Sequence, residues 1–194
     1  MKEAEIQKYQ PAYIYKYDEF AKLADEQMKI FWPWSEIKVA KDKQDLLVNM
    51  TEAEYHGVVT TLKLFTKYEL FVGNEYWLSR VMQRFPRPEI QRFAAVAGHV
   101  ELNSHAPFYN QINKELFLDT EEFYNSYVED PILVDRMKFI SDLVDHEDDA
   151  ISLAGFSVVE GKILYTNFAF LKHFQSKGKN KIANVVRGIN MSVR

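Results

Sequence analysis

The chain has 194 residues, of which 47% are hydrophobic and 27% are charged. This length is sufficient for one domain with a sizeable core. The formal net charge of −4 gives no reason to expect nucleic-acid binding, and the absence of cysteine excludes disulfides and thiolate metal ligands. No apolar run reaches the roughly 18 residues of a membrane span, and the first residues lack the apolar core of a signal peptide. We therefore expect a soluble, cytoplasmic protein.

The spacing of apolar residues predicts an all-α chain. Residues 1–17 show no clear period, which indicates an extended N-terminal arm. Residues 18–31 show helical spacing, and Pro33 ends this helix because proline disfavours helical geometry at the residue before it. Thr51 and Glu54 form a capping-box pattern, which predicts a long helix that runs to about residue 85.

The second half of the chain also indicates helices separated by short turns. Pro88 suits the first turn of a helix to about residue 116, and Pro107 inside that helix removes one backbone hydrogen bond. We expect residues 18–194 to form one helical domain. The further helices are expected at about residues 121–127, 131–146, 149–175 and from 181 onward.

Three of the predicted long helices carry a glutamate in the apolar stripe that should face the core. These are Glu69, Glu101 and Glu160. Residues four apart on a helix share one face, so His105 and Tyr109 lie on the same stripe as Glu101. One alternative is that each glutamate lies at the edge of its stripe and reaches water or a basic side chain. Three such glutamates, with a histidine and a tyrosine, favour a shared buried site.

The chemistry of these side chains predicts a metal centre. Carboxylates gathered in a low-dielectric interior repel one another, and a multivalent cation removes that cost. Carboxylate and imidazole donors without sulfur suit iron or manganese. Glutamates and histidines that project inward from a helix bundle are typical of di-iron carboxylate proteins.

Several motifs follow one another in order along the chain. They are Phe31-Trp32, the segment Val39-Ala40-Lys41-Asp42-Lys43-Gln44-Asp45, Glu69, Glu101 with His105, Tyr109, Ser157-Val158-Val159-Glu160, and the segment from Asn184 to Arg194. With these motifs, residues 13–194 resemble the small (β, radical-generating) subunit of class I ribonucleotide reductase. The resemblance implies a ferritin-like helical bundle.

The resemblance also implies roles for the candidate residues. Glu69, Glu101, His105 and Glu160 would bind a dinuclear centre of iron, with manganese or a mixed manganese–iron pair as alternatives. This centre would use O2 to oxidise Tyr109 to a stable radical. Trp32 would act as a relay close to His105. The oxidising equivalent would pass from a homodimer-like β assembly to the large (α) subunit, which reduces ribonucleotides to deoxyribonucleotides for DNA synthesis.

The chain departs from the family pattern in two places. The family pair is usually Glu-x-x-His, whereas Glu101 and His105 are four residues apart. A one-residue π-bulge would absorb the additional residue. The family then continues with an Asp-Glu-x-x-His segment and a tail that docks on the large subunit, which are absent from this sequence. We therefore expect a bundle truncated within its fourth ligand helix, from a split or truncated chain, and completed by a second chain.

Two other functions stay open from the sequence. One is another di-metal carboxylate oxidase, or an iron-binding bundle, on the same scaffold. The other is a non-catalytic fragment that only binds a partner. Tyr109, Trp32 and the segment from Val185 to Arg194 favour the reductase subunit over the first of these. Absence of metal from the assembled protein would favour the second.

Overall fold

The computed structural model describes residues 4–193. Residues 1–3 of the expected arm and Arg194, at the end of the last motif, lie outside this range. Between residues 4 and 193 the regular structure consists of α, 3-10 and π helices, without any strand. The predicted all-α class is therefore confirmed. No helix among these residues combines the length and the apolar composition needed to cross a bilayer.

The helices group into two compact units. Within the described range, the first unit contains the residues up to 36 and residues 66–109, and the second contains residues 37–65 and 110–193. Helices α2 (Glu52–Phe71) and α5 (Ala106–Glu115) each begin in one unit and end in the other. The expected single domain over residues 18–194 stays a prediction.

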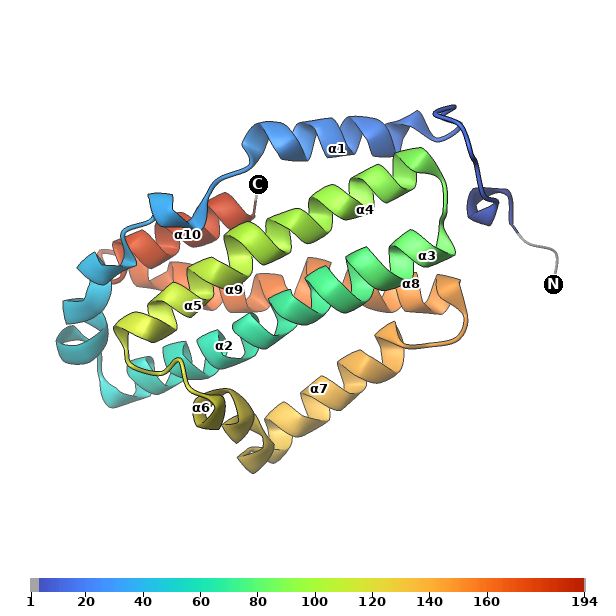
Figure 1. Cartoon of the computed structure of the whole chain (residues 1–194). Helices are drawn as coiled ribbons and strands as arrows, with labels where there is room; N and C mark the ends of the chain where they lie inside the picture. Colours follow the sequence, from blue (N-terminus) through green and yellow to red (C-terminus); the bar gives the residue numbers. More distant parts are fainter. Residues whose placement is uncertain (1–3, 194) are drawn as a thin grey trace. The chain divides into compact units, whose positions relative to one another are not determined.

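In the first unit, helix α1 lies along helix α4 (Figure 1). Helix α1 spans Asp18–Ile30 and helix α4 spans Pro88–Val100, so both begin where the sequence predicts. Pro88 occupies the first turn of α4, where its missing N–H has no intrahelical acceptor to lose. Asp25 of α1 and Arg92 of α4 form an ion pair between the two helices.

The start of α4 also holds the N-terminal arm in place. Glu89 is completely buried, and its Oε1 accepts the backbone N–H groups of Lys16 and Tyr17 and the Nε–H of Arg87. A buried carboxylate costs free energy unless it is paired and hydrogen-bonded. These contacts therefore fix the point at which the arm enters α1.

Two long helices of the first unit change their hydrogen-bonding pattern along their length. Helix α2 passes into the π-helix η5 (Val72–Val81) and then into α3 (Met82–Arg84). Helix α4 passes into the π-helix η6 (Glu101–His105) and then into α5. The expected long helices are confirmed in position. The π-helix η6 was predicted from the sequence, whereas η5 was not.

In the second unit, helices α7 and α8 lie side by side (Figure 1). Each begins at an aspartate, Asp130 or Asp148, whose side chain accepts two backbone N–H groups of the first turn. The capping box at the start of α2 is also confirmed, because Thr51 and Glu54 each accept the backbone N–H of the other. The helices of this unit include η3 (Val39–Asp42), the π-helix η4 (Asp45–Asn49), α6 (Glu121–Asn125), α7 (Pro131–Val144), α8 (Asp149–Val158), the π-helix η8 (Val159–Leu164), α9 (Tyr165–Lys172) and α10 (Ala183–Ser192).

Two aspartates from early in the chain bind the N-terminal end of α10. Asp42 is 2% exposed, and its carboxylate accepts the backbone N–H of Val185 and the side-chain amide of Asn184, both at 2.7 Å. Asp45 accepts the backbone N–H of Ile182 at 2.8 Å, where Ile182 has a φ of 49°. The first N–H groups of a helix have no acceptor within the helix. Asp42 and Asp45 supply these acceptors from a distant part of the chain.

This arrangement predicts the effect of removing the Asp42 carboxylate. Asp42→Ala leaves the Val185 N–H and the Asn184 amide without their acceptor, and should lower the free energy of unfolding by about 1–3 kcal/mol. Urea denaturation measures the change. Asp135→Ala, at an exposed position of α7, is the control and should stay within about 0.5 kcal/mol of the unmodified chain. Equal stabilities of the two variants would contradict the assigned role of Asp42.

Candidate metal centre

Glu69 lies near the end of α2, three residues before the π-helix η5. Its neighbours Tyr68 and Val72 are both buried, in agreement with the apolar stripe in the sequence. Glu69 itself is 2% exposed. A carboxylate at such a position must be paired, protonated or bound to a cation.

Glu101 and His105 occupy the two ends of the π-helix η6. The backbone N–H of Ala106 bonds to the carbonyl of Glu101, which is the i→i+5 pattern of a π turn. Within this wider turn, the ligand atoms of Glu101 and His105 lie on one face of the helix. Pro107 follows directly in α5, where its ring nitrogen cannot donate a hydrogen bond. The π-bulge expected from the Glu–His spacing is confirmed.

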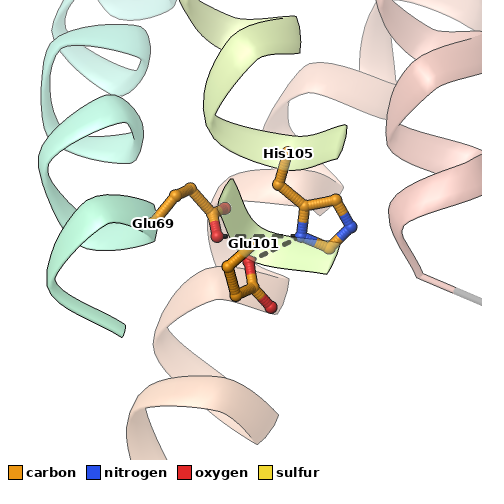
Figure 2. Close-up of side chains that lie close together, drawn as sticks. All are labelled: Glu69, Glu101 and His105. Carbon is orange, nitrogen blue, oxygen red and sulfur yellow. Dashed lines mark hydrogen bonds and ion pairs between the residues drawn. The ribbon is translucent and has the colours of Figure 1, made fainter. Parts of the chain in front are cut away.

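The two carboxylates and the imidazole meet in one place (Figure 2). One ligand atom from each of Glu69, Glu101 and His105 lies within 4.8 Å of the others. His105 Nδ1 is 2.7 Å from Glu101 Oε2 and 3.7 Å from Glu69 Oε2. All three residues belong to the first unit. We refer to Glu69, Glu101 and His105 as the ligand trio.

The trio combines a close Glu101–His105 ion pair with repulsion between two buried carboxylates. Burial raises the pKa of Glu69 well above its usual range, and the neighbouring Glu101 carboxylate raises it further. Burial alone would lower the pKa of His105, but the two carboxylates outweigh burial and raise it well above its usual range. Burial would raise the pKa of Glu101, but His105 and Glu69 together lower it. Without a metal, the trio therefore retains protons that a bound cation would displace.

The donor set of the trio fits a metal ion such as iron. Glu69 Oε1 is buried and has no hydrogen-bond partner among residues 4–193. A buried acceptor without a partner costs free energy, and a bound cation would remove this cost. Carboxylate oxygens and an imidazole nitrogen are donors that iron and manganese accept.

The two predicted redox residues, Trp32 and Tyr109, lie in the same unit as the trio. Trp32 is 4% exposed, and its ring centroid is 6.1 Å from that of His105. Tyr109 is completely buried. Phe108 contacts both, with ring centroids 5.6 Å from Trp32 and 5.1 Å from Tyr109.

The fourth predicted ligand, Glu160, is half-buried in the π-helix η8 of the second unit. The structure therefore gathers three of the four predicted ligands, and the participation of Glu160 stays a prediction. Each of the helices that carry a predicted carboxylate ligand is wound as a π-helix at that residue or within three residues after it.

Ser104 lies between the two proposed ligands of η6 and was not among the residues predicted from the sequence. Its side chain is completely buried and its hydroxyl donates to the carbonyl of Trp32 at 2.5 Å. This bond ties the Trp32 segment to the turn that carries His105. The sequence offered only a weak signal, a small polar residue in a stripe that otherwise faces the core.

Comparison with known proteins places the chain in a family. The family model for ribonucleotide reductase, small chain, matches residues 12–194. No curated protein matches the chain significantly. The family match confirms the resemblance drawn from the sequence and the predicted ferritin-like fold. The chain therefore belongs to the ribonucleotide reductase small-chain family, whose members are oxidoreductase subunits that bind a pair of metal ions, dimerise and act with a large subunit.

Proposed function

We propose that this chain forms part of the radical-generating centre of a class I ribonucleotide reductase, with Glu69, Glu101, His105 and Glu160 as metal ligands. The observation that carries the proposal is the gathering of the ligand trio, which places two carboxylates and an imidazole within 4.8 Å of one another. A dinuclear iron centre held there would supply, with O2, the oxidising power that Tyr109 requires.

The residues of the trio would prepare the site by releasing their protons. Metal ligands bind in their deprotonated form, so any proton that the trio holds must leave as the cation enters. Glu101, whose carboxylate lies 2.7 Å from His105 Nδ1, is positioned to orient the imidazole. The wide turn of η6 allows both of these side chains to reach the same cation.

Tyr109 would hold the radical in a dry environment. Its side chain is completely buried, four residues after His105 on the same helical segment. To form a neutral radical the phenol must lose one electron and its proton. Burial then keeps water and external reductants away from the ring. Phe108, which packs against Tyr109, contributes to this exclusion.

Trp32 would carry the oxidising equivalent between the metal centre and the large subunit. Its ring lies 6.1 Å from that of His105, and the Ser104 hydroxyl holds its backbone carbonyl. An aromatic ring at this distance from His105 is close enough to transfer an electron to a metal ion that His105 would bind. Ser104 would therefore act as a positioning residue for Trp32.

The four proposed ligands are fewer than a dinuclear centre of this type uses. Such centres in helix bundles take one Glu from each of two helices and a Glu-x-x-His pair from each of two others. Glu69 and Glu160 would be the single glutamates, and Glu101 with His105 one of the pairs. We infer that the second pair comes from polypeptide outside these 194 residues. That polypeptide would also carry the contact with the large subunit.

Metal binding by the trio is open to a direct test. His105→Ala should raise the dissociation constant for Fe²⁺ or Co²⁺ at least about tenfold, because the change removes a ligand and leaves two carboxylates facing each other. Equilibrium dialysis followed by metal analysis measures this constant. His99→Ala is the matched control, since His99 is an exposed histidine in the same long helix. Comparable losses in both variants would argue against a metal site at the trio.

Formation of a radical on Tyr109 can be followed by electron paramagnetic resonance. In protein combined with the polypeptide that supplies the second ligand pair, loaded with Fe²⁺ and exposed to O2, Tyr109→Phe should abolish the tyrosyl signal and leave the bound metal nearly unchanged. Tyr76→Phe alters another buried tyrosine of the same unit and should keep the signal. A tyrosyl signal that persists in the Tyr109 variant would exclude this assignment. A metal-loaded protein without any radical would favour an iron-binding bundle instead.

The requirement for further ligands predicts a difference in stoichiometry. The 194-residue chain alone should bind one metal ion at the trio rather than two, and should give no reductase activity. Addition of a polypeptide that begins with Asp-Glu-x-x-His should restore both, in the presence of the large subunit. Full metal loading and activity from this chain without the added polypeptide would rule the inference out.

A further inference from the structure

Two buried glycines lie where the η5 helix passes the helix that carries Glu101 and His105. Gly73 belongs to η5, four residues after Glu69, and Gly98 belongs to α4, three residues before Glu101. Both are buried and both are part of the first unit. Helix interiors disfavour glycine by about 1 kcal/mol relative to alanine, so close packing is a physical reason to retain it there.

Gly73 leaves room for the residues at the start of η6. A Cβ at position 73 would lie 2.9 Å from Leu102 Cγ and 3.2 Å from the Cβ of Glu101. Carbon atoms that are not bonded attract each other best at about 3.5–4.0 Å, so both contacts would be repulsive. The second of these contacts is with a proposed ligand itself. A side chain at position 73 would therefore push directly on Glu101.

Gly98 forms the reciprocal contact with a leucine of η5. A Cβ at position 98 would lie 2.6 Å from Leu78 Cγ. Leu78 is 36% exposed, so its side chain has room to turn toward solvent. Each helix thus inserts a leucine into the gap that a glycine leaves in the other. Of the two gaps, only the one at Gly73 adjoins a residue of the trio.

We propose that Gly73 is a positioning residue that sets the separation between the Glu69 helix and Glu101, and with it the metal affinity of the trio. This inference rests on the proposed metal-binding function. The helix carrying Glu69 continues into η5, so a shift of η6 away from Gly73 also moves Glu101 away from Glu69. Gly98 supports the same packing at a greater distance from the ligands, and its replacement should have a smaller effect.

A double-mutant cycle between Gly73 and Leu102 tests the inference in the full chain. Co²⁺ is the probe, because its visible absorption reports the number and arrangement of its ligands as well as its affinity. Gly73→Ala should raise the Co²⁺ dissociation constant about tenfold or more and alter the absorption spectrum. Leu102→Ala removes the side chain that a new methyl group would meet. In that background only the 3.2 Å contact with Glu101 Cβ remains, so Gly73→Ala should weaken Co²⁺ binding by a smaller factor than it does in the unmodified chain.

Gly57→Ala is the matched steric control. Position 57 lies in the second unit, in the same helix as Glu69, and a Cβ there would lie 2.8 Å from the ring of Phe170. This variant introduces an equally close contact without touching the trio, and should leave the Co²⁺ affinity and spectrum unchanged. An equal loss of affinity in the Gly57 and Gly73 variants would overturn the inference, as would a loss in Gly73→Ala that Leu102→Ala does not relieve.

The remaining outcomes also decide the question. If Gly73→Ala alone does not fold, the double variant is compared with Leu102→Ala. A folded double variant of similar affinity supports the inference, and one that fails to fold or binds far more weakly overturns it. An unmodified chain that binds Co²⁺ while Gly73→Ala binds it equally well overturns this inference alone. An unmodified chain that binds no Co²⁺ overturns the proposed function and this inference with it.

Discussion

The central constraint on the structure is that two carboxylates and one imidazole lie together in the interior of the first unit. Glu69 is 2% exposed and Glu101 is 9% exposed, so water does little to screen their repulsion. His105 offsets part of this repulsion by retaining a proton, as the rise in its pKa indicates. A divalent cation would offset it more fully and would satisfy the buried Glu69 oxygen. The proposed metal ion would therefore lower the free energy of this site.

The helices and their boundaries were predictable because their signals are local. The capping box at Thr51 and the proline at the start of α4 act within one turn. The η6 helix was predictable because the separation of Glu101 and His105 is one residue longer than the Glu-x-x-His pair of the family that the sequence resembles. The π-helices η5 and η8 were not predictable. Apolar spacing does not distinguish an α from a π turn when no motif of known spacing marks the difference.

The sequence predicted which side chains would share a buried site, but it did not predict the distances between them. Periodicity placed each side chain on a buried face, but only the packing of α2 against η6 shows how close Glu69 comes to His105. The roles of Ser104 and Gly73 were not predictable for the same reason. Ser104 bonds to Trp32 across 72 positions of sequence, and the need for glycine at position 73 depends on Leu102 in another helix. A local pattern carries no information about partners so far along the chain.

The attachment of α10 to Asp42 has a consequence for the order in which the chain folds. The two hydrogen bonds of Asp42 to Asn184 and Val185 span 142 and 143 positions of sequence. Closing so long a loop carries a large entropic cost, and contacts of this kind slow folding. During synthesis, the segment around Asp42 leaves the ribosome long before its partner does. The start of α10 can therefore join only after residues 184 and 185 have emerged, so this contact forms later than those among the preceding helices.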